Sequence, residues 1–303
     1  MSLSQPKRIL IIKLRHHGDV LLSTPVVDAL KTRFPDCEID MLVYAGTGQL
    51  IADNPQIAQI FTIDRNWKKL GVFKQLACEK NLFAKLKARD YDWAFNLSDQ
   101  WRAAVIAKLC ARCSVGLDCI KRDGFWWRFC HDFINHELDP SHHIVENQLN
   151  ILAPLIQPED VADAKVRLWV AQDARESMRQ KLREQGWSGE DYVLMHPGAR
   201  WHFKCWEDGK NAAIVQLLLN SGQNVVLTAS PDNVEQYMLQ EIIGRLNIPE
   251  GGKVWVLSGC LSLRELAAAI EGAKLFIGVD SAPMHIAAAL DKPQIALFGA
   301  SWV

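Results

Sequence analysis

The sequence lacks the long apolar run, the apolar leader and the excess of charge that would each indicate a particular class of protein. No apolar run in the 303 residues reaches the ~18 needed for a membrane-spanning helix. The first residues, MSLSQPKR, lack the apolar centre of a signal peptide. The formal net charge is −1, which excludes bulk attraction to nucleic acid. We therefore expect a globular, cytoplasmic protein with no transmembrane segment and no nucleic-acid partner.

Two common glycine-rich phosphate motifs are also missing. Neither GxGxxG nor GxxxxGK[ST] occurs in the chain, so a dinucleotide site or a P-loop lacks its main support. The eight cysteines include a single CxxC pair, Cys110 and Cys113, which is a weak zinc signal without a second pair. We expect reduced structural thiols, with a metal site that includes His131 as the alternative. No bound metal or cofactor is predicted.

What the chain does contain is an alternation of short apolar runs with helical patterns, which indicates parallel sheets covered by helices on both faces. The predicted strands are residues 8–14, 38–45, 59–64, 91–97, 114–118, 192–199, 224–230, 254–259, 274–280 and 294–300. The predicted helices are residues 24–34, 81–89, 100–111, 145–156, 209–222, 233–246, 263–270 and 282–290.

The length and a polar, proline-containing stretch at residues 157–165 predict two domains. We expect Rossmann-like, doubly wound parallel-sheet domains at residues 1–160 and 161–303, facing a cleft. Ligands in such sheets bind beyond the carboxyl ends of the strands, where the strand order reverses. The chain stops just after a strand, so the second domain is expected to be incomplete at its C-terminus.

Each half places an acidic residue between a strand and a helix. Gly18-Asp19 follows the first strand, and Asp280 precedes Ser281 and Pro283 in the second half. Ser281 is a good N-cap, and the free N–H groups of a helix start attract anions. Each carboxylate has a structural alternative as a helix cap. The functional alternative is that Asp19 accepts a proton and that Asp280 faces sugar hydroxyls.

Two further loops at strand ends carry polar side chains. The loop HPGARWHFKCW offers Arg200, His202 and Lys204, which suit a diphosphate, although a solvated basic loop has the same composition. After the next strand, Asp232 or Glu235 suits ribose hydroxyls, and a simple N-cap at Asp232 is the alternative.

The stretch KRDGFWWRFCHDF at residues 121–133 mixes cations with aromatic side chains. Aromatic rings beside arginine suit sugars, phosphates or a membrane surface. The alternative is an ordinary helix with a buried aromatic stripe. His285, one turn into the last helix, likewise serves either packing or anion binding.

Taken together, ILIIKLRHHGDVLLSTPVVDALKTRFP and FIGVDSAPMHIAAALDKPQIALFG resemble the ADP-heptose:lipopolysaccharide heptosyltransferases, glycosyltransferase family 9. The segments NLSDQW and FKCW, and the HHGD form of the first motif, are similar to the heptosyltransferase III branch. The resemblance covers essentially the whole chain. It implies a GT-B fold and metal-independent, inverting transfer of L-glycero-D-manno-heptose from ADP-heptose to the lipopolysaccharide inner core. The implied step adds heptose III to heptose II at the inner face of the inner membrane.

The resemblance also implies roles for single residues. Asp19 matches the proposed general base, for which the adjacent His16 and His17 are the alternatives. The predicted donor-binding residues are Met195, Lys204, Glu235, Asp280, Ser281, Ala282 and His285. The predicted acceptor-binding residues are His16, His17, Lys121, Arg122 and Arg128.

Other activities fit the same patterns. Heptosyltransferase I or II activity would use the same site. A sugar-nucleotide epimerase on the GT-B fold would change ADP-heptose without an acceptor, and a non-catalytic nucleotide-binding module would bind ADP without turnover.

Overall fold

The computed structural model describes residues 5–118, 124–135, 142–157, 161 and 163–298. The chain divides into two compact units, residues 1–167 and 168–303, and each is described by itself. The predicted boundary lay at residue 160. No helix in the described part of the chain is both long and apolar enough to cross a membrane.

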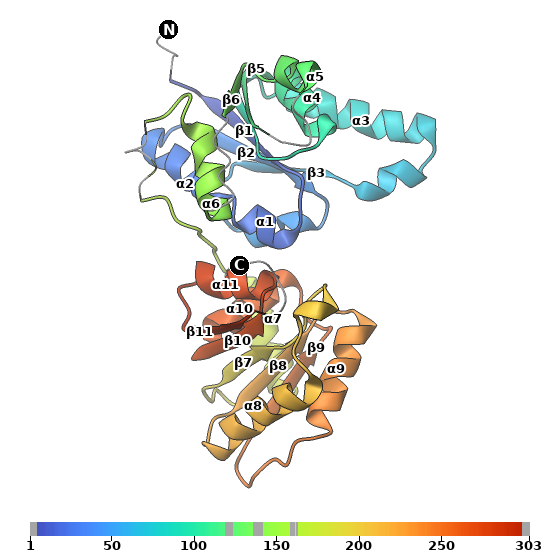
Figure 1. The fold of residues 1–303 in the computed structure, drawn as a ribbon, viewed down its shortest axis with the longest axis vertical. Coiled ribbons are helices and arrows are strands. Elements are labelled where there is room, and N and C mark those ends of the chain that lie inside the picture. Colours follow the sequence, from blue (N-terminus) through green and yellow to red (C-terminus); the bar gives the residue numbers. More distant parts are fainter. Residues whose placement is uncertain (1–4, 119–123, 136–141, 158–160, 162, 299–303) are drawn as a thin grey trace. The chain divides into compact units, whose positions relative to one another are not determined.

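The N-terminal unit is built on a six-stranded parallel sheet with the order β3-β2-β1-β4-β5-β6 (Figure 1). The order reverses between β1 and β4, so the loops after these two strands diverge at the carboxyl edge. The strands are β1 (Arg8–Lys13), β2 (Glu38–Tyr44), β3 (Gln59–Ile63), β4 (Tyr91–Asn96), β5 (Ala111–Leu117) and β6 (Phe133–Asn135).

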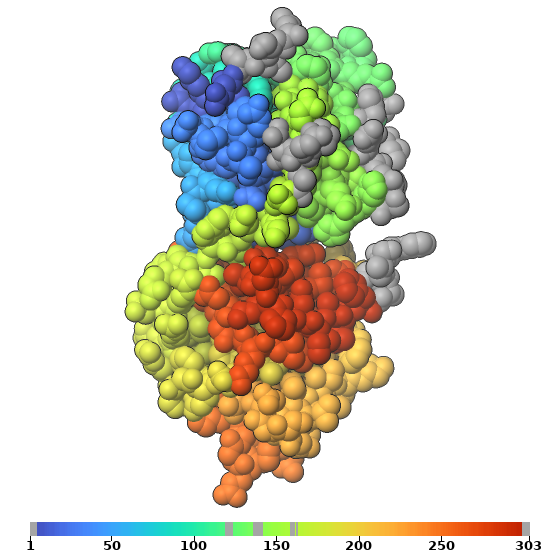
Figure 2. Space-filling model, turned by 90° about the vertical axis from the view of Figure 1, so that its left-hand side faces the viewer, coloured from blue at the N-terminus to red at the C-terminus, as the bar shows by residue number. Residues whose placement is uncertain are grey.

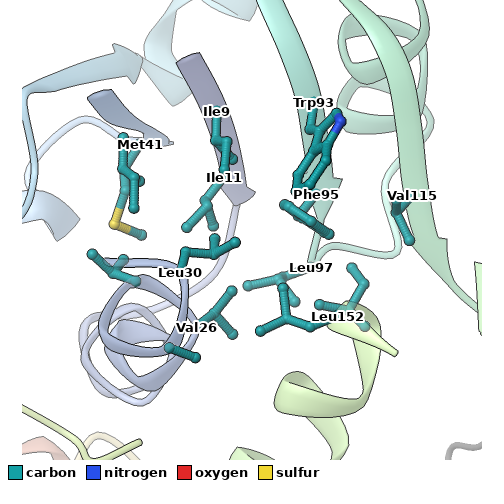
Figure 3. Close-up of a cluster of buried hydrophobic side chains, with 14 of the residues drawn as sticks. Ile9, Ile11, Val26, Leu30, Met41, Trp93, Phe95, Leu97, Val115 and Leu152 are labelled. Carbon is teal, nitrogen blue, oxygen red and sulfur yellow. The ribbon is translucent and has the colours of Figure 1, made fainter. Parts of the chain in front are cut away.

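Side chains along the central strand β1 alternate between the two faces of the sheet, and helices cover both faces. Ile9 and Ile11 pack with Val26, Leu30 and other residues on one face (Figure 3). Figure 2 views the unit from that side, where α2 in blue lies beside α6 in yellow-green. The helices of this unit are α1 (His17–Leu21), α2 (Thr24–Arg33), α3 (Val72–Lys87), α4 (Trp101–Cys110), α5 (Phe125–Phe129) and α6 (Ile144–Leu149). The short 3-10 helices are η1 (Thr47–Ile51), η2 (Arg65–Lys69) and η3 (Asn150–Leu152).

Leu10 and Ile12 face the other way, where Leu82 and Leu86 of α3 and Ile106 of α4 cover them. The predicted helix at residues 81–89 corresponds only to the second half of α3, which begins at Val72. The first half of α3 was not predicted as helix, because it has no apolar stripe that packs against the sheet.

The end of the N-terminal unit is tied to α2 through Asp28. This buried carboxylate accepts hydrogen bonds from Lys165 N at 3.2 Å and from Arg167 Nε at 2.8 Å. Arg167 N also donates to Thr24 Oγ1 at 3.1 Å. These bonds explain why the compact unit extends beyond residue 160.

The C-terminal unit contains a five-stranded parallel sheet with the order β11-β10-β7-β8-β9, which reverses between β7 and β10. The strands are β7 (Val193–His196), β8 (Val225–Ala229), β9 (Val254–Ser258), β10 (Leu275–Val279) and β11 (Gln294–Leu297). The helices are α7 (Gln172–Arg183), α8 (Asp208–Asn220), α9 (Asn233–Ile243), α10 (Leu263–Gly272) and α11 (Ala282–Ala289), with the 3-10 helix η5 (His202–Lys204). The predicted α/β class with parallel sheets is confirmed.

Candidate active site

The loop that carries Asp19 is held against the loop after β4. Leu14 N donates to Ser98 Oγ at 2.6 Å, and Gln100 Nε2 donates to Leu14 O at 3.0 Å. Arg15 forms an ion pair with Asp99 at 2.9 Å. Because both loops leave the sheet where its strand order reverses, these bonds fix the start of α1 at the position where such sheets bind ligands.

Asp19 lies in the first turn of α1 and is half-buried. One carboxylate oxygen, Oδ2, accepts a hydrogen bond from His16 N at 3.3 Å. The predicted capping role is therefore present. It leaves acceptor capacity on the carboxylate, since two oxygens provide about four lone-pair sites. Capping and proton acceptance are compatible at this residue.

Basic groups surround the start of α1. Lys13 is buried at the end of β1 and donates to Leu97 O at 3.2 Å. Burial lowers the pKa of Lys13 to about 8, an effect that the negative charge of Asp19 opposes. Burial, with the nearby charges of His16 and Arg65, also lowers the pKa of His17, which favours the neutral imidazole. Lys13 was not among the predicted site residues, although a lysine that ends an otherwise apolar strand is a visible signal in the sequence.

The predicted acceptor-binding residues are only partly described. His16 is exposed at the N-cap of α1. His17 is partly buried, and its Nδ1 atom has no hydrogen-bond partner among the described residues. Arg128 is exposed on α5. Lys121 and Arg122 lie outside the residues that the structure describes.

The aromatic segment is divided between the core and the surface. Trp127 is buried, makes an edge-to-face contact with Trp101 at 5.6 Å between ring centroids, and donates from Nε1 to Leu117 O. Trp126 and Phe129 are exposed and contact each other at 6.1 Å. Trp127 therefore belongs to the packed stripe, and its neighbours belong to the surface.

In the C-terminal unit, Lys204 of η5 donates from Nζ to Asp280 Oδ2 at 2.5 Å. The two side chains follow β7 and β10, the strands between which the sheet order reverses, and each is about one-fifth exposed at 20% and 21%. The structure therefore brings together the two predicted charges of the donor site.

The start of α11 lies directly after Asp280. Ser281 occupies the N-cap position, as predicted, but its hydroxyl donates to Val279 O at 3.2 Å and makes no cap bond to the helix. Ala282 and Pro283 form the first turn, and His285 is partly exposed one turn further. Pro283 has no N–H, and Met284 N donates to Ser281 O at 3.1 Å, so the N–H of Ala282 and the positive end of the helix dipole are what this start offers to an anion.

Glu235 in the first turn of α9 is held from several sides. Its Oε2 accepts from Ser230 N at 2.9 Å and lies 3.7 Å from His196 Nε2. Asp232 is the N-cap of α9 and accepts from Val234 N, so its capping alternative holds. Both carboxylates are therefore held in place, Asp232 as the exposed cap of α9 and Glu235 as a buried group that is only 8% exposed.

His196 and Gly198 support Glu235, and neither was among the predicted site residues. His196 Nδ1 lies 2.9 Å from Thr228 Oγ1, and burial lowers the pKa of His196 although Glu235 opposes the shift. The signal was present in the HPGA segment at the end of β7. Met195, by contrast, is fully buried in the apolar core, so its side chain offers no surface to a ligand.

Gly198→Ala tests this support. A methyl group at Gly198 would lie 2.5 Å from Glu235 Oε2, so the carboxylate or the loop must move. We expect a loss of about 1–3 kcal/mol in the free energy of unfolding, measured by urea denaturation. Gly209→Ala on α8 is the control, because nothing lies within 4 Å of the added methyl group. Equal effects of the two substitutions would contradict the close contact.

A metal site that includes the CxxC cysteines is the predicted alternative to reduced structural thiols. Cys110 ends α4 and Cys113 lies in β5; burial raises the pKa of each thiol to about 11, which favours the protonated form. Cys119 lies outside the described residues. Within the described ranges, no group of three or more His, Cys, Asp or Glu side chains is placed to hold a metal ion.

The family model for glycosyltransferase family 9 (heptosyltransferase) matches residues 80–302. The chain belongs to glycosyltransferase family 9. It is 37% identical over 289 residues to the lipopolysaccharide heptosyltransferase 3 of Escherichia coli, with 95% of this chain and 82% of the relative covered. The heptosyltransferase 3 of strain K12 is 38% identical over 293 residues, covering 95% and 81%. The predicted family is confirmed.

Solved structures of this glycosyltransferase family share the fold. A glycosyl transferase family 9 protein from Veillonella parvula aligns with a TM-score of 0.82 and 21% identity, covering 98% of this chain and 81% of that chain. The ADP-heptose lipopolysaccharide heptosyltransferase II of E. coli aligns with a TM-score of 0.78 and 22% identity, covering 97% and 86%. The predicted GT-B fold is confirmed.

Proposed function

We propose that this glycosyltransferase transfers L-glycero-D-manno-heptose from ADP-heptose to the lipopolysaccharide inner core, and that it adds heptose III to heptose II. The observation that carries the proposal is the identity of 37% and 38%, over 95% of the chain, to two lipopolysaccharide heptosyltransferases 3. A lipopolysaccharide heptosyltransferase 1 of E. coli is only 23% identical, which favours the heptosyltransferase III activity over I.

In the donor site, Lys204 and the start of α11, through the N–H of Ala282 and the positive end of the helix dipole, would neutralise the diphosphate. Displacement of ADP leaves negative charge on that diphosphate, and fixed donors stabilise such charge without a metal. Asp280 would accept hydrogen bonds from heptose hydroxyls, and Glu235 from the ribose hydroxyls. Ser281, Ala282 and His285 would line the phosphate side, and Met195 would act only through the backbone that leads into His196.

On the acceptor side, Asp19 would remove the proton from the attacking hydroxyl of the acceptor. The hydroxyl oxygen then forms its bond to the anomeric carbon, and the bond from that carbon to the diphosphate oxygen breaks, so that ADP leaves with the electron pair. His16 and His17 would position acceptor phosphates together with Lys121, Arg122 and Arg128. The unpartnered Nδ1 atom of His17 supports a polar ligand at this position.

The acceptor in this proposal is a membrane lipid, so the enzyme would work in the cytoplasm at the inner face of the inner membrane. The exposed aromatic side chains of α5, beside Arg128, support contact with that surface.

A donor–acceptor assay with defined truncated cores tests the function. We expect transfer of one heptose to a core that ends with heptose II, and no transfer to cores that lack it. Transfer to a core that lacks heptose II would instead indicate heptosyltransferase I or II activity. Conversion of ADP-heptose without any acceptor would indicate an epimerase, and ADP binding without turnover would indicate a binding module.

A further inference from the structure

The N-terminal unit carries an apolar groove between α3 and α4 that the proposed reaction does not use. The groove has a volume of about 550 Å³. Leu76 and Phe83 line it from α3, and Trp101, Val105 and Leu109 line it from α4. Residues 76, 80 and 83 share one face of α3 because they are three or four positions apart, and residues 101, 105 and 109 do the same on α4.

Apolar side chains continue beyond the groove along the first half of α3. Phe73, three residues before Leu76, is 89% exposed, and Leu76 is 59% exposed. The only buried residues of α3 are Leu82 and Leu86, both in its second half. Figure 1 shows the first turns of α3 extending away from the sheet. This part of the helix therefore presents apolar surface that the described part of its own unit leaves largely exposed.

The segment that contains α3 is also rich in positive charge. Residues 65–87 contain seven Lys and Arg and a single acid, Glu79, in a chain whose net charge is −1. Glu79 is neutralised by Arg102 of α4 at 2.6 Å, and Lys68, Lys69 and Lys74 are exposed. The segment therefore carries exposed apolar side chains together with a net positive charge.

We infer that the groove between α3 and α4, together with the exposed first half of α3 and the lysines of residues 65–87, docks on an anionic lipid surface. Helices that lie in a membrane interface combine Phe and Leu on one side with Lys and Arg beside them. Protein–protein interfaces are instead depleted of lysine, which disfavours a protein partner at this face. The inference deepens the proposed function, since the proposed acceptor is a membrane lipid.

Vesicle co-sedimentation of the full chain tests the docking surface without any substrate. We expect binding to vesicles of phosphatidylethanolamine and phosphatidylglycerol that exceeds binding to phosphatidylcholine vesicles. Phe73→Ser with Leu76→Ser should lower the partition coefficient by about a hundredfold. Replacing Lys68, Lys69 and Lys74 with Gln should lower it by about fivefold per lysine.

Leu217→Ser is the matched control, because Leu217 is also an exposed helical leucine, at 66%, but lies on α8. The inference is wrong if the wild type does not bind anionic vesicles, or if Leu217→Ser reduces binding as much as the groove variant. It is also wrong if the groove substitutions abolish a dimer, seen by sedimentation velocity, and leave vesicle binding intact. Transfer to a water-soluble core fragment reports on the proposed function separately, and it should be unchanged in the groove variant.

Discussion

Replacing Asp19 with asparagine is expected to lower the rate of heptose transfer by about 10²–10⁴-fold, the usual contribution of a positioned general base. The affinity for ADP-heptose should stay unchanged, because Asp19 is assigned to the acceptor hydroxyl. Steady-state kinetics together with calorimetric titration of the donor measure the two quantities. Full turnover by Asp19→Asn would overturn the assignment of the base.

Comparing Asp19→Asn with Asp19→Ala separates the loss of catalysis from the loss of stability at this position. An asparagine side chain retains an oxygen that accepts from His16 N, so Asp19→Asn should unfold at the wild-type temperature. Asp19→Ala loses that bond and should cost about 0.5–1.5 kcal/mol of stability as well as the activity.

His17→Gln tests the alternative base. A loss of rate with His17→Gln as large as that with Asp19→Asn would make the histidine part of the base.

Lys204→Ala should produce the second large effect, a fall in the transfer rate of about 10²–10³-fold, because one fixed donor to the charge that develops in the transition state is removed. The substitution also leaves the carboxylate of Asp280 without its 2.5 Å partner, so that a negative charge would face the diphosphate. ADP affinity should therefore weaken together with the rate. Lys204→Arg, which keeps the charge, is the control and should retain more activity than Lys204→Ala.

Asp280→Asn distinguishes the two halves of the ion pair. Since ADP carries no heptose, this substitution should leave ADP binding intact or strengthen it, while transfer from ADP-heptose falls. Loss of ADP affinity in Asp280→Asn, equal to the loss in Lys204→Ala, would show that Asp280 acts only by holding the lysine in place.

All strands except the three-residue β6, which is only partly buried, were predictable from sequence because parallel sheets bury both of their faces. Residues such as Ile9, Leu10 and Ile11 then form continuous apolar runs that no surface helix would show. The helix α7 escaped prediction for the opposite reason. It buries only Ala174, Met178 and Leu182 among charged neighbours, so its apolar signal is thin.

The charged residues of the proposed donor site were predictable from motifs, whereas the residues that hold them in place were not. Lys204 and Asp280 follow predicted strands, and polar residues at the carboxyl ends of parallel strands indicate a ligand site. Gly198 has its role only because Glu235, which is distant in sequence, packs against it, and no local pattern records such a contact. Met195 shows the converse error, since a residue next to a functional loop can still belong wholly to the core.

The unburied first half of α3 also bears on the dynamics of the chain. Apart from contacts such as the ion pair of Glu79 with Arg102, this segment has little tertiary packing, and a helix segment of this length is marginal in water when backbone hydrogen bonds are its main support. Its amide protons should therefore exchange with solvent through local fraying, long before the central strand β1 opens. Contact with lipid would supply the missing packing, so that the segment which meets the membrane would also be the one that gains order there.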